Sequence, residues 1–234
     1  MSLKTAAILV GGLGTRLRPL ISHVPKPLAP IGEEPFLFLL IRDLVKCGYL
    51  NIILLTSYRH EVIQKACGSE LFGASILYSQ EITPLGTAGA LKHAEYFLKN
   101  KKEFLLLNGD TYIDDFKLLV SENFDNALGL IGVMKPKKND RYGDVLMDDK
   151  NKIISFQEKS LLKETYVNAG IYKFSSRVLD FIPEKKVCSL EKEIFPKLIE
   201  QHELLKGISL DGNFYDIGVP ESYLEFVKMK REEG

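Results

Sequence analysis

The sequence has few cysteines and no tryptophan. Cys47, Cys67 and Cys188 lie far apart, and their number is odd. A disulfide framework uses paired cysteines, and a structural zinc site uses closely spaced ones. The pattern therefore excludes both and predicts free thiols in a reducing compartment.

The chain also lacks an excess of either charge, because 31 Lys and Arg residues balance 31 Asp and Glu residues. A protein that binds nucleic acid usually carries a basic excess or a basic stripe. No apolar run approaches the ~20 residues of a membrane-spanning helix. The N-terminus shows no charged segment followed by an apolar signal segment. We expect a cytoplasmic protein without a nucleic-acid or membrane partner, and one compatible with a homo-oligomer.

The first half of the chain alternates strand and helix signals. Short apolar runs indicate buried parallel strands, and longer amphipathic runs that end at glycine indicate helices. The expected strands are 6–10, 52–56, 76–79 and 104–108, and the expected helices are 36–47, 61–67 and 87–98. This alternation predicts an α/β fold, a Rossmann-like three-layer αβα sandwich with a mixed, mostly parallel central sheet.

The second half is less regular. Strand signals at 127–134, 144–148, 152–157, 167–174 and 214–217 include a hairpin across residues 149–151. Ser189 is expected to cap a helix over 190–200 that Pro196 kinks or breaks. Pro220 is expected to open an amphipathic helix with Tyr223, Leu224 and Val227 on one face. We expect one domain over residues 1–234.

Three glycines, Gly11, Gly12 and Gly14, follow the first strand, with Arg16 beside them and Lys26 between two prolines. Glycine permits positive φ and close approach of the backbone, so amide N–H groups can point at a phosphate. A P-loop ends in Gly-Lys-Ser/Thr, which this loop lacks. Leu17 stands where a dinucleotide fingerprint has its third glycine. The segment therefore predicts a phosphate-binding turn of another kind.

Gly-Gly-x-Gly-Thr-Arg-Leu-Arg-Pro-Leu, followed by Pro-Lys-Pro-Leu-x-Pro-Ile, resembles the signature of the sugar-phosphate nucleotidyltransferases that make nucleotide sugars. The resemblance covers nearly the whole chain. It implies a nucleotide-binding part at about residues 1–115 and a sugar-phosphate-binding part at about 116–234. Gly11, Gly12, Gly14 and Thr15 would bind the triphosphate. Arg16 would steady the leaving pyrophosphate, and Lys26 would contact phosphate near the reacting α-phosphorus.

Two aspartates stand at the carboxyl ends of expected strands, where such folds place their sites. Asp110 follows strand 104–108, and Asp216 precedes Gly218. Alone, each aspartate would more often form a turn. As a pair within the family pattern they are expected to ligate one Mg²⁺ ion, a hard cation that prefers oxygen ligands. Asp110 is also expected to be catalytic.

The segment from Tyr78 to Ala90 looks like the family's base-reading loop, with Gly86 and Thr87 expected to bind the nucleotide. Glu81 accepts hydrogen bonds only, and guanine presents two adjacent donors, so Glu81 would select GTP. In the alternative, Glu81 faces solvent and Gln80 reads the base.

By the same resemblance, Lys159 would bind the acceptor phosphate, and Gly143, Glu158 and Asn168 would bind sugar hydroxyls. Shorter segments look most like guanylyltransferases of this family that act on D-glycero-α-D-manno-heptose 1-phosphate for bacterial surface glycans. The expected reaction joins GMP from GTP to that sugar 1-phosphate. A mannose 1-phosphate or UTP/dTTP-dependent enzyme, a non-catalytic nucleotide-sugar sensor and a nicotinamide oxidoreductase remain alternatives.

Overall fold

The computed structural model describes residues 3–21, 23–135, 144–157 and 166–232. The chain forms two compact units. The first unit comprises Met1–Pro84, Leu107–Tyr112 and Asn213–Gly234, and the second comprises Leu85–Leu106 and Ile113–Gly212. This division differs from the expected boundary near residue 115, because Asn213–Gly234 belongs with the N-terminal part and Leu85–Leu106 with the second unit.

The first unit contains the strand order β7-β1-β4-β6-β5. β1 pairs in parallel with β4, β4 pairs in parallel with β6, and the short β5 closes the edge antiparallel to β6. The elements of this unit are β1 (Lys4–Leu9), a 3₁₀ turn η1 (Lys26–Leu28), β2 (Pro30–Ile31), β3 (Glu34–Pro35), α1 (Phe36–Lys46), β4 (Tyr49–Thr56), α2 (His60–Cys67), β5 (Glu70–Leu71), β6 (Ala74–Gln80), β14 (Phe214–Asp216) and α7 (Pro220–Glu232). Strand β7 (Glu103–Asn108) begins in the second unit and ends in the first, and β8 (Thr111–Ile113) runs back to the second.

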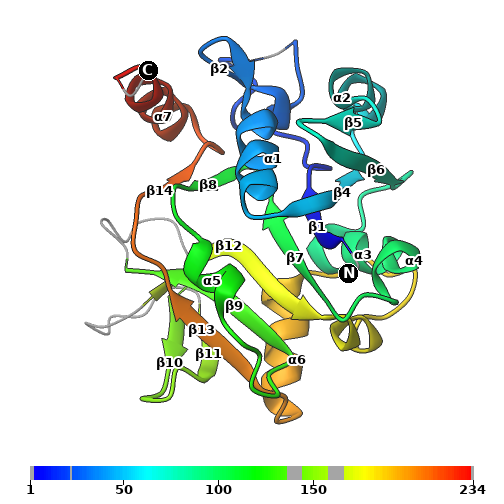
Figure 1. Ribbon diagram of the computed structural model, residues 1–234, viewed down its shortest axis with the longest axis vertical. Helices are drawn as coiled ribbons and strands as arrows, with labels where there is room; N and C mark the ends of the chain where they lie inside the picture. Colours follow the sequence, from blue (N-terminus) through cyan, green and yellow to red (C-terminus); the bar gives the residue numbers. More distant parts are fainter. Residues whose placement is uncertain (1–2, 22, 136–143, 158–165, 233–234) are drawn as a thin grey trace. The chain divides into compact units, whose positions relative to one another are not determined.

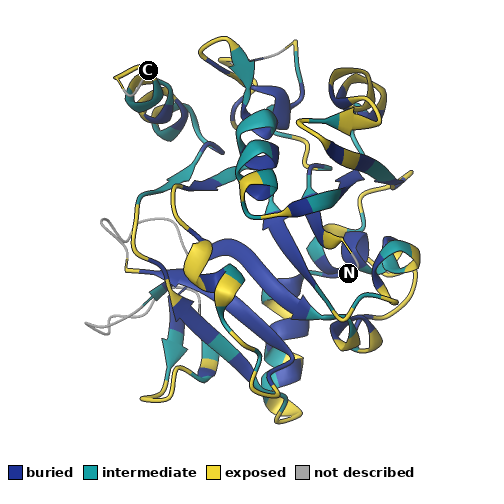
Figure 2. Ribbon diagram, in the orientation of Figure 1, coloured by how far each residue is buried: buried dark blue, intermediate teal, exposed yellow. Residues whose placement is uncertain are grey.

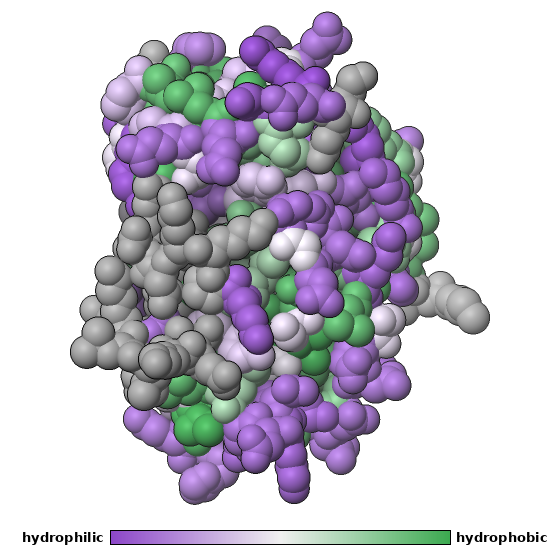
Figure 3. All heavy atoms as spheres, turned by 90° about the vertical axis from the view of Figure 1, so that its left-hand side faces the viewer, coloured by the Kyte–Doolittle hydropathy of each residue, from purple (hydrophilic) through white to green (hydrophobic). Residues whose placement is uncertain are grey.

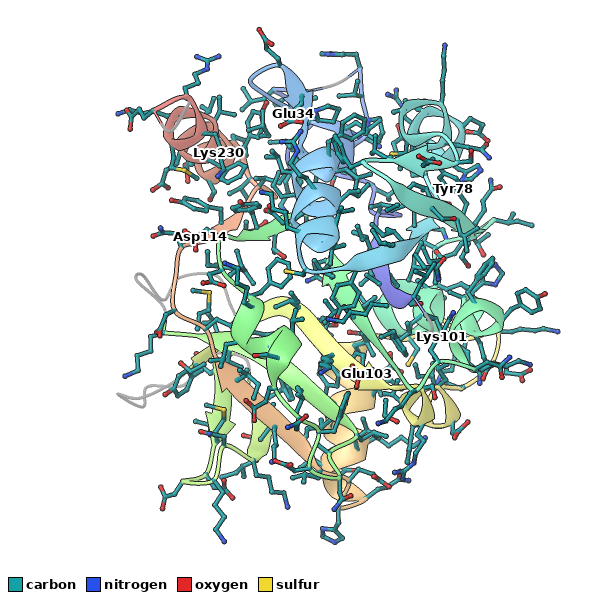
Figure 4. The ribbon with its side chains drawn as sticks, viewed as in Figure 1. Glu34, Tyr78, Lys101, Glu103, Asp114 and Lys230 are labelled. Atoms are coloured by element: carbon teal, nitrogen blue, oxygen red, sulfur yellow. The ribbon has the colours of Figure 1, made fainter. Side chains whose placement is uncertain are left out.

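The strands of the first unit consist mostly of apolar residues, and helices cover them. Figure 2 shows β1 buried along most of its length, whereas the helices are exposed on their outer sides. Helix α1 packs on β4 (Figure 1), and the buried residues of the helix include Phe36, Leu40 and Leu44. A bidentate ion pair from Arg42 to Glu34, at 2.6 and 2.5 Å, ties the helix to β3 (Figure 4).

The second unit is built on β12, which pairs antiparallel with both β9 and β10. β13 adds in parallel to β9, and β10 and β11 form an antiparallel hairpin. Its elements are α3 (Gly86–His93), α4 (Glu95–Leu98), α5 (Lys117–Ser121), β9 (Gly129–Met134), β10 (Asp144–Met147), β11 (Ile153–Gln157), β12 (Tyr166–Ser175), a 3₁₀ turn η2 (Ser176–Phe181), a π-helical turn η3 (Leu190–Ile194), α6 (Phe195–Glu200) and β13 (Leu205–Ser209).

Strand β12 alternates between two covered faces. Tyr172 and Phe174 point to α6, where both pack against Phe195. Lys173 points the other way, and its buried ammonium group donates to the carbonyls of Val120 and Glu122 at the end of α5. Figure 1 shows α5 and α6 on opposite sides of this strand. Because successive side chains of β12 point to opposite faces, this strand contributes to the packing on both of its sides in the second unit.

The expected fold class is confirmed: the sheet is mixed and mostly parallel, with flanking helices. The expected helix after Ser189 is confirmed: Ser189 caps it, and it starts as the π-helical turn η3 and becomes α-helical one residue before Pro196. Two local expectations were wrong. The helix expected over 87–98 breaks at Ala94 into α3 and α4. Leu224 is exposed, because the buried stripe of α7 follows the 3.6-residue period from Tyr223 to Phe226.

Among the described residues, none of the helices is both long enough and apolar enough to span a membrane. On the face shown in Figure 3, polar and charged side chains cover much of the surface, and apolar groups gather only in small clusters.

Candidate active site

The glycine turn after β1 packs directly on Lys26. Gly14 has a φ of +60°, and a Cβ atom there would lie 3.0 Å from the Cβ atom of Lys26. Leu17 donates its N–H to the carbonyl of Gly14 at 3.1 Å, and its side chain is buried. Leu17, which stands where a dinucleotide fingerprint has its third glycine, is therefore a core residue that holds the turn in place. Thr15 and Arg16 remain exposed on the turn.

Gly11 and Gly12 differ in their surroundings. A Cβ atom at Gly11 would lie 3.1 Å from the Cβ atom of Ser57, whereas a Cβ atom at Gly12 would meet nothing within 4 Å. Gly12 is exposed. The backbone at Gly12 is accordingly the part of the turn that a large ligand can approach.

Lys26 is held by its buried proline neighbours, Pro25 and Pro27. Its Nζ atom donates to Oδ2 of Asp110 at 2.5 Å. The side chain of Lys26 is 9% exposed and that of Asp110 is 41% exposed. The ammonium group is thus nearly buried, while the carboxylate beside it stays open to solvent.

Asp110 and Asp216 are brought together by backbone contacts. Gly109 donates its N–H to the carbonyl of Leu9 at 2.9 Å, and a side chain at Gly109 would overlap that carbonyl. Glycine therefore lets the end of β7 lie against the end of β1. The N–H of Ile217 donates to the carbonyl of Asp110 at 2.9 Å, which ties the end of β14 to the same point.

Gly218 marks where the charged side chains converge. A Cβ atom there would lie 2.6 Å from Oδ1 of Asp216, 2.9 Å from Nζ of Lys26 and 3.4 Å from a guanidinium nitrogen of Arg16. The N–H of Gly218 also donates to Asp216 at 2.6 Å. We call Arg16, Lys26, Asp110 and Asp216 the charged cluster. The structure brings together these four residues, which sequence reasoning selected separately.

The two carboxylates of the charged cluster repel each other. Burial raises the pKa of Asp216, and the negative charge of Asp110 raises it further, although the Gly218 N–H, Lys26 and Arg16 lower it. A dication relieves such repulsion. No group of three or more His, Cys, Asp or Glu residues forms a metal site in the described ranges. Two carboxylates suit Mg²⁺, which usually takes one or two carboxylates and completes its shell with water and substrate phosphates.

The base-reading segment places Glu81 inward. Its side chain is buried, and its N–H donates to the carbonyl of Thr56 at 2.8 Å. The adjacent Gln80 is exposed, as is Ile82. The solvent-facing position that the alternative gives to Glu81 is therefore wrong, whereas its other half, the reading of the base by Gln80, stays a prediction.

In the second unit, Gly86 and Thr87 open α3 against the segment before η3. Gly86 has a φ of +76°, and a Cβ atom there would lie 2.5 Å from the carbonyl oxygen of Cys188. The hydroxyl of Thr87 donates to Glu191 at 3.0 Å and accepts the N–H of Leu190 at 2.8 Å. The side-chain proton of Thr87 is therefore used within this unit.

Asn168 of β12 hydrogen bonds to Tyr172, and Tyr172 in turn bonds to Glu191. Gly143, Glu158 and Lys159, the other expected acceptor-site residues, lie outside the described residues. Sequence reasoning assigned no role to Gly218, Tyr172 or Glu191. Tyr172 lies in segment 167–172 and Glu191 in segment 189–193, both of which resemble segments of the family, so that resemblance is the signal that could have found them.

The chain matches the family described as Nucleotidyl transferase over residues 5–233. It is 39% identical, over 95% of this chain and 98% of the relative, to the D-glycero-alpha-D-manno-heptose 1-phosphate guanylyltransferase of Campylobacter jejuni subsp. jejuni serotype O:2. It is 41% identical to the mannose-1-phosphate guanylyltransferase catalytic subunit beta of Drosophila melanogaster, over 94% of this chain but 60% of that protein.

Among solved structures, HddC from Yersinia pseudotuberculosis superimposes with a TM-score of 0.84 at 29% identity, over 97% of this chain and 99% of that one. HddC has also been solved in complex with GMP-PN. The chain belongs to the nucleotidyl transferase family. This confirms the family expected from the sequence and removes the oxidoreductase alternative.

Proposed function

We propose that this protein transfers GMP from GTP to D-glycero-α-D-manno-heptose 1-phosphate and releases pyrophosphate. The observation that carries the proposal is the charged cluster, which sets two cations and two carboxylates around Gly218 beside the glycine turn. A reaction between two phosphate groups needs charge neutralisation at the transferred phosphorus more than it needs a nucleophile from the protein.

In the proposed reaction, an oxygen of the acceptor phosphate attacks the α-phosphorus of GTP in line with the leaving group. A new P–O bond forms, the bond from the α-phosphorus to the bridging oxygen breaks, and pyrophosphate leaves with that electron pair. The acceptor phosphate is already ionised, so no side chain has to remove a proton. None of the four histidines is required.

The residues of the charged cluster have separate tasks in this proposal. Arg16, exposed on the turn, neutralises the departing pyrophosphate, and Lys26 neutralises charge at the α-phosphate. Asp110 and Asp216 would hold Mg²⁺, which would supply further neutralisation of the phosphates when bound. The backbone at Gly11, Gly12 and Gly14, together with Thr15, would hold the triphosphate.

Guanine as the base is supported by the burial of Glu81. A buried carboxylate accepts from the ring N–H and the exocyclic amine of guanine by two parallel bonds. Uracil and thymine place carbonyls on both sides of their single ring donor, and one of these carbonyls would repel the carboxylate. Gly86 and Thr87 would contribute to the same recognition.

The heptose is supported by similarity along the whole length of the Campylobacter jejuni enzyme. Lys159 would bind the acceptor phosphate, and Gly143, Glu158 and Asn168 would bind sugar hydroxyls. The product, GDP-heptose, would serve surface glycan synthesis in the cytoplasm. Mannose 1-phosphate is the second candidate acceptor, because the chain is as similar to a mannose-1-phosphate guanylyltransferase.

The test is pyrophosphate release with Mg²⁺ from each of GTP, UTP, dTTP, CTP and ATP, against the heptose 1-phosphate and α-D-mannose 1-phosphate. Release with GTP and the heptose 1-phosphate alone supports the proposal. Preference for mannose 1-phosphate would make mannose 1-phosphate the acceptor in place of the heptose 1-phosphate. Preference for UTP or dTTP contradicts the role of Glu81. Absence of release with every pair overturns the proposed function and favours a nucleotide-sugar sensor.

A further inference from the structure

The side chain of Glu191 is the meeting point of three hydroxyl groups in the second unit. Oε2 accepts from Thr87 at 3.0 Å and from Ser189 at 2.8 Å, and Oε1 accepts from Tyr172 at 3.2 Å. An ionised carboxylate has acceptor sites for all three and no proton to donate. Every hydroxyl in this network must therefore point its proton toward Glu191.

The direction of the hydrogen bond at Tyr172 follows from this. Because the phenol proton goes to Glu191, the phenol oxygen is the acceptor in its hydrogen bond with the Nδ2 group of Asn168, at 2.8 Å. The Oδ1 atom of Asn168 accepts the N–H of Gly170 at 3.0 Å. Both ends of the Asn168 amide are thus oriented, one by a backbone donor and one by the chain through Tyr172.

A bulge in β12 brings the side chains of Asn168 and Tyr172 into contact. The register with β9 shifts between Asn168 and Tyr172, and Gly170 within the shift has a φ of +70°. In a regular strand, residues four apart are separated by about 13 Å along the strand. The bulge shortens that span and directs the amide of Asn168 to the phenol of Tyr172.

Tyr172 is suited to transmit orientation. Its ring is buried, stacks on Phe174 at 5.5 Å and packs against Phe195 at 5.6 Å. A ring fixed in this way cannot turn to compensate for a lost partner. Glu191 is fixed as well, by Thr87 at the start of α3 and by Ser189 at the start of η3.

We infer that Glu191 is a positioning residue that sets the donor and acceptor directions of Asn168 through Tyr172, and thereby the recognition of a sugar hydroxyl. This inference rests on the proposed function, in which Asn168 contacts the acceptor sugar. After its two internal bonds, the Asn168 amide retains one N–H and one oxygen lone pair for a hydroxyl group. If the Asn168 amide were rotated by 180°, its remaining N–H and its oxygen lone pair would exchange places, and they would no longer match the sugar hydroxyl.

The first experiment compares steady-state kinetics of Tyr172→Phe, Glu191→Gln and the double variant with the natural protein. Tyr172→Phe removes one hydroxyl and keeps the ring. It should raise the KM for heptose 1-phosphate about tenfold, the effect of one lost hydrogen bond to an oriented group. Its kcat and its KM for GTP should change by less than about twofold, because the GTP-binding groups are untouched.

Glu191→Gln should also raise the KM for the sugar phosphate, because an amide cannot accept at both ends. The increases of the two single changes should not add in the double variant, since both interrupt one chain of contacts. The matched control is Glu193→Gln, on the same turn, whose carboxylate accepts the N–H of Ser189 at 3.0 Å and pairs with Lys186 at 3.9 Å, outside the chain from Glu191 to Asn168. The control should keep the KM of the natural protein. Additive effects, or equal changes in the KM values for GTP and the sugar phosphate, would overturn the inference.

The second experiment does not need turnover, so failure of the proposed function and failure of this inference can be told apart. The side-chain ¹⁵N–¹H signals of Asn168 are identified by their loss in Asn168→Asp. The proton donated to Tyr172 should move upfield in both Tyr172→Phe and Glu191→Gln, and should stay in place in Glu193→Gln. Unchanged Asn168 signals in Glu191→Gln would overturn the positioning role, whatever reaction the protein catalyses.

Discussion

Lys26 and Asp110 form an ion pair across 84 residues of sequence, with 2.5 Å between Nζ and Oδ2. The pair joins the lysine packed on the glycine turn to the carboxylate at the end of β7. One group is suited to phosphate and the other to a cation, so the contact sets a phosphate-binding group beside a cation-binding group. A metal ion held by Asp110, as proposed, would compete with this ammonium group.

Asp110→Asn removes the negative charge with little change in shape. Turnover should fall at least about 1,000-fold, because both the ion pair and the proposed metal ligand are lost. Thermal unfolding should stay within a few degrees of the natural protein. Pyrophosphate release measures turnover, and calorimetry measures thermal unfolding. The control is Asp180→Asn, at an exposed position of η2. Near-normal turnover would exclude the metal role.

Lys26→Met keeps the length of the side chain and removes its charge. Turnover should fall, yet affinity for Mn²⁺ alone should rise about tenfold, because the ammonium group no longer competes for Oδ2 of Asp110. Titration calorimetry with Mn²⁺ measures the affinity. Lys46→Met is the control, since Lys46 pairs with Asp43 on the exposed side of α1. Unchanged or weaker binding in Lys26→Met would show that Asp110 does not hold the ion.

Gly218→Ala places a methyl group among the charged side chains. Its Cβ atom would lie 2.6 Å from Oδ1 of Asp216 and 2.9 Å from Nζ of Lys26, so these groups must move apart. Turnover should fall at least about 100-fold, because small displacements of reacting groups are costly. The free energy of unfolding should change by less than about 1 kcal/mol, since alanine also restricts the unfolded chain. Full activity would mean that the arrangement around Gly218 is not used.

Glu81→Gln tests the reading of the base. The amide presents one acceptor and one donor, so it keeps one bond to guanine and pairs better with uracil or thymine. The kcat/KM for GTP should fall about 100-fold, and the preference for GTP over UTP should shrink. Gln80→Ala, at the exposed neighbouring position, should leave both values unchanged. An unaltered preference in Glu81→Gln would move the base-reading role elsewhere.

Cys67 makes the first unit sensitive to alkaline pH. Burial raises the pKa of its thiol from 9.0 to about 11, and burial, then the charge of Cys67, raise the pKa of Tyr78 to about 12. The hydroxyl of Tyr78, on β6 (Figure 4), donates to the carbonyl of Gly68 at 2.5 Å. Both groups are neutral in the folded protein at pH 8.

A raised folded pKa means that the contribution to stability is complete below pH 9 and declines as the unfolded thiol ionises. Between pH 9 and 11, the thiol should cost on the order of 2 kcal/mol of unfolding free energy. Urea denaturation across this range measures the decline. Cys67→Ala, which has no thiol to ionise, should give a flatter profile, and equal slopes in the two proteins would contradict the assignment.

Local patterns in the sequence predicted most of the longer strands, the main helices and the glycine turn, because apolar periodicity and the use of glycine at Gly14 are local properties. They missed β13 and the short strands β2, β3, β5 and β8. The long signature around Gly11 to Lys26 was enough to identify the family. Local patterns misjudged Leu224 because neighbouring residues on a helix lie about 100° apart, and the sequence does not say which face meets the rest of the unit.

The way in which the residues of the charged cluster meet follows from the folded structure and not from any local pattern. Arg16, Lys26, Asp110 and Asp216 come from separate segments, and their convergence at Gly218 depends on β7 lying beside β1 and on the bond from Ile217 to Asp110. The burial of Glu81 and the hydrogen bonds from Thr87 and Tyr172 to Glu191 likewise come from contacts between distant segments. Such contacts depend on strand order and on the bulge in β12, which no short stretch of sequence specifies.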